Sequence, residues 1–129
     1  MFIIVLALNK NGVTNYISSL LGNNHIILKY GIKSYLSCNL INNIPMSVMF
    51  ASIPNFANQL DYAKAIYAIT IGSNIGAFLT PIGALAGIMF TDLLNRQQVK
   101  YGFKDFIKYG IIISIPTLLV ALLGLFISL

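Results

Sequence analysis

Two short polar stretches interrupt a mostly apolar sequence and carry side chains that could bind a small solute. The first is Cys38–Pro45 (CNLINNIP) and the second is Gly72–Gly83 (GSNIGAFLTPIG). Amide, hydroxyl and carbonyl oxygens of this kind suit a hard cation or a polar, uncharged solute. The candidate binding residues of the two stretches are Asn42, Asn43, Pro45, Ser73, Asn74, Thr80 and Pro81.

Each stretch also contains residues that interrupt helices. Pro45 removes a backbone donor and disfavours helix at Ile44. The second stretch contains four residues that break helices, Gly72, Gly76, Pro81 and Gly83. Free backbone groups survive at membrane depth only inside protein or beside a water-filled cavity. The half-helix ends would add partial charges of roughly half an electron to a site there. Such half-helices with unwound backbone between them are how transporters build binding sites.

Simpler interpretations of these stretches remain open. The Asn-rich tip could be a surface turn between two short helices. The second stretch could be a kink satisfied by Ser and Thr, or its Gly72–Gly76 spacing could serve helix packing.

Enzyme chemistry finds no support in the sequence. Its three acidic residues, Asp61, Asp92 and Asp105, lie at segment ends, and there is no Glu. No carboxylate pair, Ser-His-Asp set or phosphate-binding Gly-rich loop with a Lys is visible. The sequence has one histidine, His25, and one cysteine, Cys38, so neither a His/Cys metal cluster nor an internal disulfide can form. We therefore expect no catalytic residue, no metal and no cofactor.

Composition indicates an integral membrane protein. Hydrophobic residues make up 57% of the chain and charged residues only 9%, whereas a soluble domain carries about a quarter charged residues. The net charge of +5 is explained by Lys and Arg flanking membrane segments. Because no aromatic-interleaved basic stripe occurs, we expect the lipid bilayer, and no nucleic acid, as a partner.

The pattern of apolar segments predicts an all-α, polytopic fold in one membrane domain, residues 1–129. The segment 34–58 could be a re-entrant hairpin or a single kinked crossing, and the sequence leaves this choice open. Basic residues place the loop 91–106 in the cytoplasm. The expected elements are a helix stub at 1–8, the hairpin or kinked span at 34–58, a broken helix at 62–90 and a last span at 107–129.

Two motifs carry a resemblance to a known family. Leu36–Met46 (LSCNLINNIPM) and Gly72–Ala86 (GSNIGAFLTPIGALA) resemble the last third of arsenical pump membrane proteins, the arsenite and antimonite efflux carriers of a large ion-transporter superfamily. Further likeness lies in Asp92–Lys100, Phe106–Pro116 and Ile4–Tyr16, so the resemblance covers nearly the whole chain. Its most specific parts are the NNIP tip and the SN…LTPIG interruption.

The resemblance implies a multi-pass protein of the plasma membrane with an inverted-repeat fold, in which each half has a re-entrant hairpin and a discontinuous helix. It places the candidate residues in a central site. It also implies secondary-carrier efflux of arsenite or antimonite, driven by the membrane potential or a proton gradient, with an ATPase subunit as an optional partner.

Such a carrier is much longer than this chain and contains a first repeat that is absent here. The sequence therefore predicts a fragment or a truncated reading frame that is inactive alone or requires the missing N-terminal half. A sodium/proton antiporter or an organic-anion carrier of the same superfamily is an alternative. A membrane structural protein that transports nothing is an alternative of another class.

Overall fold

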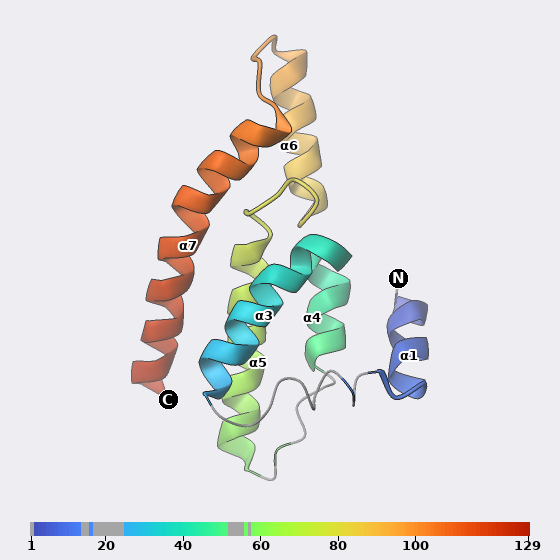
Figure 1. The fold of residues 1–129 in the computed structure, drawn as a ribbon, viewed down its shortest axis with the longest axis vertical. Coiled ribbons are helices and arrows are strands. Elements are labelled where there is room, and N and C mark those ends of the chain that lie inside the picture. Colours follow the sequence, from blue (N-terminus) through green and yellow to red (C-terminus); the bar gives the residue numbers. More distant parts are fainter. Residues whose placement is uncertain (1, 14–15, 17–24, 52–55, 57) are drawn as a thin grey trace.

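The computed structural model describes residues 2–13, 16, 25–51, 56 and 58–129. Every regular element in these ranges is a helix, which confirms the all-α class for the described part of the chain. Part of the predicted 34–58 segment, residues 52–55 and 57, lies outside it. The helices are α1 (Phe2–Lys10), α3 (Ile26–Ile41), α4 (Asn43–Ala51), α5 (Gln59–Gly76), α6 (Leu85–Arg96) and α7 (Phe103–Ser128) (Figure 1).

Helices α3 and α4 form a hairpin in which the chain reverses direction at Asn42 (Figure 1). Asn42 adopts φ 77° and ψ 148°, a conformation that few residues other than glycine adopt. Pro45 lies in the first turn of α4. Backbone N–H groups of a first turn have no acceptor within the helix, so the missing N–H of proline costs no helical hydrogen bond there. The α4 helix has 9 residues, about 14 Å, which is far less than the ~30 Å of a bilayer core.

The interruption of the second polar stretch begins later than the glycines suggest. Helix α5 continues through Gly72 to Gly76, and the non-helical segment, called the break below, comprises residues 77–84. A Cβ atom on Gly72 would meet the Gly31 carbonyl oxygen and Ser34 Oγ of α3, and one on Gly76 would meet the Tyr35 carbonyl oxygen. The two glycines therefore permit close helix contact, as in the packing interpretation, and do not unwind the chain.

The core lies between α3 and α5, which make the most extensive contact of the described helices. Ala65, Ala68 and Gly72 of α5 are buried in this core. Because these residues are small, the backbones of α3 and α5 approach closely at Gly72. Small residues favour such contacts where lipid replaces water and apolar burial gives little driving force.

Helix α7 has 26 residues and, among the described helices, is the one long and apolar enough to cross a membrane. Gly110, Ser114, Leu118 and Leu122 form its buried edge, with one residue on each successive turn. Tyr35 Oη and Ser114 Oγ share a hydrogen bond of 2.6 Å that joins α3 to α7. Most other apolar side chains of α7 are exposed, as expected for a face in contact with lipid or with further protein.

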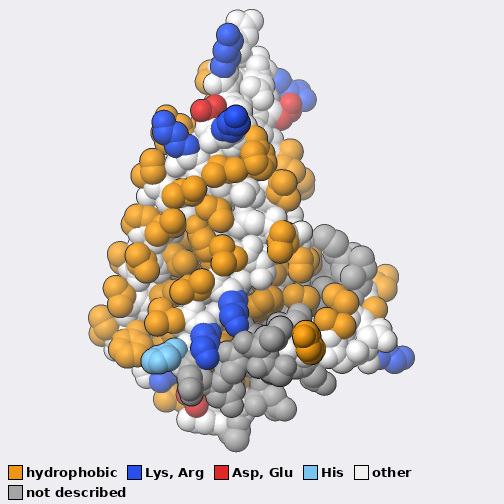
Figure 2. Space-filling model, viewed as in Figure 1, with side chains coloured by type: hydrophobic (Ala, Val, Ile, Leu, Met, Phe, Trp, Pro, Cys, Tyr) orange, Lys and Arg blue, Asp and Glu red, His pale blue; other side chains and the backbone are white. Residues whose placement is uncertain are grey.

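The surface carries basic groups near both ends and hydrophobic side chains between them. Figure 2 shows one gathering of Lys and Arg where α6 and α7 meet, and others toward the opposite end. The hydrophobic side chains in between cover much of the visible face. A lipid-facing belt bounded by charged residues has this arrangement.

Candidate functional site

The tip of the α3–α4 hairpin lies directly against the break. The backbone N–H of Asn43, the first residue of α4, donates to the Gly83 carbonyl oxygen at 3.1 Å. Thr80 Oγ1 donates to Asn39 Oδ1 at 2.7 Å. Two stretches about forty residues apart in the sequence are therefore joined at one place in the fold.

Asn39 of α3 forms hydrogen bonds with both the end of α5 and the break, and it was not among the predicted site residues. Besides accepting from Thr80, its Nδ2 donates to the carbonyl oxygens of Gly76 and Tyr35, each at 3.1 Å. A Cβ atom on Gly83 would lie 2.9 Å from Asn39 Oδ1, so Gly83 leaves room for this amide. The signal that could have identified Asn39 is its position one helical turn before the tip.

The backbone of the break is largely satisfied by nearby protein groups. Ala77 N donates to Ser73 O at 3.3 Å, Phe78 N to Ile75 O at 3.1 Å, and Leu79 N to Gly76 O at 3.0 Å. These bonds tighten the last turn of α5 before the chain leaves the helix. Non-helical backbone is tolerated at membrane depth under this condition.

A cavity of about 730 Å³ opens beside the tip and the break. Among the described residues that line it, Asn43 of the tip and Asn74 of α5 carry side-chain amides, and none is Asp, Glu, Lys, Arg or His. Asn74 Nδ2 donates to the Thr70 carbonyl oxygen at 2.9 Å, which leaves Oδ1 and the second Nδ2 hydrogen for a solute. The described residues that line it are Asn43, Asn74, Ala77, Phe78, Ala84, Ala86, Gly87, Phe90, Tyr101, Phe106, Tyr109, Gly110 and Ile113.

Aromatic rings from α6, α7 and the segment between them form one wall of the cavity. The Tyr101 ring lies between those of Phe90, at 5.8 Å between centroids, and Tyr109, stacked at 6.4 Å. Desolvation, together with the nearby Asp105 carboxylate, raises the pKa of Tyr101 above its ordinary value of 10.0. The phenol therefore stays neutral near pH 7, and this wall adds no charge to the cavity.

The remaining predicted residues have different surroundings. Ser73 is buried and donates to the Thr70 carbonyl oxygen at 3.1 Å within α5. Asn42 forms the hairpin turn, and Pro45 is buried in the first turn of α4. Pro81 is buried in the break. Gly87 of α6 lies close to it, since a Cβ atom added to Gly87 would be 2.9 Å from the Pro81 Cα. The structure thus places Asn43 and Asn74 at the cavity, whereas Thr80 is bound to Asn39.

These features define a helical membrane protein built on a helical hairpin and a helix interrupted by a break. The sequence matches the family described as arsenical pump membrane protein over residues 1–129, and the chain belongs to this family. The predicted resemblance is thereby confirmed, and the chain is an integral membrane protein of the cell membrane.

Curated relatives agree with this assignment. The chain is 29% identical to the arsenical pump membrane protein of Escherichia coli K12, over 97% of this chain and 31% of the relative. It is 31% identical to a putative arsenical pump membrane protein of Bacillus subtilis, over 79% of this chain and 24% of the relative. A 46 kDa membrane protein of Mycobacterium leprae is 26% identical over 98% of this chain. The chain spans about a third of the length of these relatives, and no solved structure matches it.

Proposed function

We propose that the chain forms part of a secondary carrier that exports arsenite or antimonite, with the solute bound in the cavity between Asn43 and Asn74. One observation carries this proposal: the hairpin tip and the interrupted helix contribute amides to one cavity, and none of the described residues that line it is charged. The relatives are named arsenical pump membrane proteins, and this name supplies the substrate class.

The chemistry of the cavity suits such a solute. Arsenite at neutral pH is an uncharged molecule that carries hydroxyl groups. The amide oxygens of Asn43 and Asn74 can accept hydrogen bonds from hydroxyl groups, and the Asn43 amide can also donate. A neutral solute enters an uncharged cavity without the cost of burying an unpaired charge. A sodium/proton antiporter would ordinarily use an ionisable side chain at its site, and the cavity lining offers no such support for that alternative.

The proposed activity belongs to a longer carrier. The chain spans 31% of the relative from E. coli K12, and half of an inverted-repeat site cannot provide alternating access alone. We propose that the preceding part of the carrier supplies a second hairpin and a second broken helix that face this cavity.

The test is arsenite accumulation in everted membrane vesicles that contain the chain together with the preceding part of the carrier. Asn43→Ala and Asn74→Ala each remove a hydrogen bond to the solute, worth about 1 kcal/mol, so we expect about fivefold higher half-saturating arsenite concentrations. Pro81→Ala, which changes the break, should lower cellular arsenite resistance.

Asn95→Ala is the matched control, because Asn95 is exposed in the last turn of α6 and does not line the cavity. Unchanged transport in both cavity variants, at equal amounts of protein in the membrane, would reject the site assignment. No arsenite accumulation with the parent chain and the preceding part of the carrier would instead favour a structural protein that transports nothing.

A further inference from the structure

We propose that the first turns of α7 bind an anionic phospholipid, with the phosphate on Lys104 and Lys108 and an acyl chain along the apolar face of the same helix. This lipid site lies at the corner between α6 and α7; its two lysines are not among the described residues of the solute cavity, whose lining it adjoins at Tyr109. It does not depend on which solute the carrier moves.

The two lysines are placed to act on one phosphate. They are four residues apart on α7 and therefore share one face of the helix. Both are exposed, and Lys100 lies just before the helix. Figure 2 shows Lys and Arg side chains gathered at this corner of the molecule.

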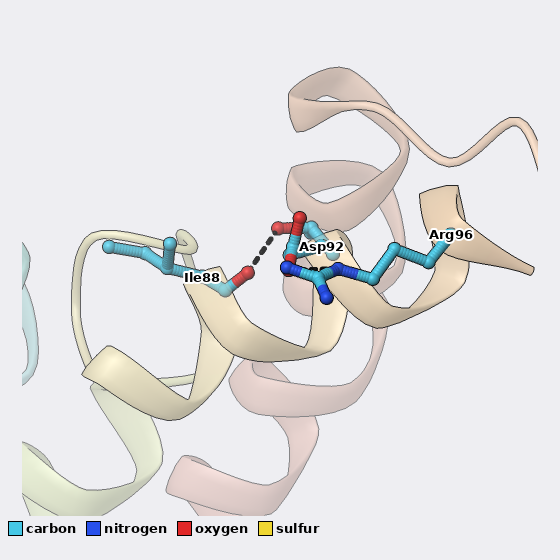
Figure 3. A network of polar contacts seen from close by, with 4 residues as sticks. Ile88, Asp92 and Arg96 are labelled. Atoms are coloured by element: carbon cyan, nitrogen blue, oxygen red, sulfur yellow. Dashed lines mark hydrogen bonds and ion pairs between the residues drawn. The ribbon is translucent and has the colours of Figure 1, made fainter.

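The acidic groups at this corner are engaged elsewhere. Asp92 Oδ2 accepts from Arg96 Nε at 2.8 Å, and Figure 3 shows the two side chains side by side on α6. Asp105 Oδ2 accepts from the backbone N–H of Gly102 at 3.0 Å and caps the start of α7. Four basic and two acidic side chains leave a formal charge of +2 between residues 91 and 108. The Asp92–Arg96 pair leaves the lysines as the carriers of this excess.

An exposed apolar face continues directly from the lysines. Ile112, Ile115 and Leu119 follow Lys108 on the same face of α7 and are 61%, 44% and 53% exposed. From Lys108 to Leu119 the helix rises by about 17 Å. This length is close to half of the ~30 Å bilayer core and thus to the length of one leaflet.

Aromatic side chains mark the level of the headgroups at the same place. Tyr109 is 51% exposed, and Lys108 Nζ lies 5.9 Å from the centroid of its ring. Tyr residues are enriched at membrane–water interfaces because one end of the side chain is apolar and the other polar. A cationic pair, an interfacial ring and an apolar face of one-leaflet length together fit one lipid molecule. A soluble phosphate would use only the first of these features.

The test uses the 129-residue chain, purified in detergent and titrated with phosphatidylglycerol or with phosphatidylcholine of the same acyl chains. Bound lipid is counted by native mass spectrometry. We expect phosphatidylglycerol to bind about tenfold more tightly, because each lysine adds attraction to an anionic lipid. The double variant Lys104→Gln/Lys108→Gln should lose this preference, while Lys104→Arg/Lys108→Arg should keep it.

Lys10→Gln is the matched control, since Lys10 is an exposed lysine at the end of α1, away from this corner (Figure 1). It should leave the preference unchanged. Equal binding of the two lipids, or a preference that survives the double Gln variant, would overturn the proposal. Displacement of phosphatidylglycerol by glycerol phosphate at similar concentrations would also overturn it, because the headgroup alone would then suffice.

Discussion

At the scale of single residues, Asn39 has the most connections around the site. One side chain bonds the end of α5 through Gly76, the break through Thr80, and its own helix through Tyr35. An amide can make all of these bonds because it has a donor and an acceptor end. The position of the break relative to the hairpin tip therefore depends on a residue that does not itself line the cavity.

Replacement of this residue should loosen the junction. We expect Asn39→Ala to lower the free energy of unfolding by about 1–2 kcal/mol, because the Gly76 carbonyl and the Thr80 hydroxyl lose their partner in a partly buried place. The measurement is denaturant or thermal unfolding of the chain in detergent micelles. Asn95→Ala, the same change at an exposed position of α6, should leave stability within about 0.5 kcal/mol of the parent. Equal stability of the two variants would contradict the role assigned to Asn39.

Residue types in the sequence identified the polar side chains near the site but not their individual roles. Asn74 and Ser73 are adjacent, yet Asn74 lines the cavity and Ser73 is buried with its hydroxyl bound to Thr70. Adjacent residues on a helix point about 100° apart, so the direction of the helix relative to its neighbours decides which one reaches the cavity. That direction is set by the packing of α5 on α3, which the sequence alone does not specify.

At the scale of elements, glycine and proline predicted that a helix is interrupted between residues 62 and 90 without predicting where. Glycine has two opposite uses in membrane helices, because it lowers helix propensity and also permits close backbone contact. Gly72 and Gly76 serve the second use against α3, so the helix continues through them. The break starts at residue 77, and the tip residues hold it in place.

This use of glycine can be tested by adding one methyl group. We expect Gly72→Ala to destabilise the chain by about 1–3 kcal/mol, since the new Cβ would collide with the Gly31 carbonyl oxygen of α3, a backbone atom that cannot move alone. Unfolding in detergent is again the measurement. Gly124→Ala is the matched control, because nothing lies within 4 Å of a Cβ there and alanine favours helix by up to about 1 kcal/mol. If Gly72→Ala also stabilised the chain, close α3–α5 contact would not be the reason for this glycine.

At the scale of the whole molecule, helix lengths and charge distribution disagree about the segment 34–58. The positive-inside rule favours a full crossing, because a hairpin places Lys10, Lys29 and Lys33 outside. The lengths favour a hairpin, since α3 with 16 residues and α4 with 9 residues measure about 24 and 14 Å. Neither reaches ~30 Å, and the chain turns back at Asn42. We therefore propose that both ends of the hairpin face the same side of the membrane.

Single cysteines introduced near the ends of the helices decide between these topologies. The native thiol, Cys38, is fully buried and is replaced by Ala in the background chain. In intact cells, a membrane-impermeant maleimide should label cysteine at His25 and at Gln59 but not at Gln97, which lies at the end of α6 in the loop expected in the cytoplasm. Cell lysis should then expose the cysteine at position 97. If residues 34–58 formed a full crossing, the cysteine at position 25 would instead behave like the one at position 97 and stay unlabelled until lysis. Such a result would exclude the re-entrant hairpin and, with it, the proposal that both ends of the hairpin face the same side of the membrane.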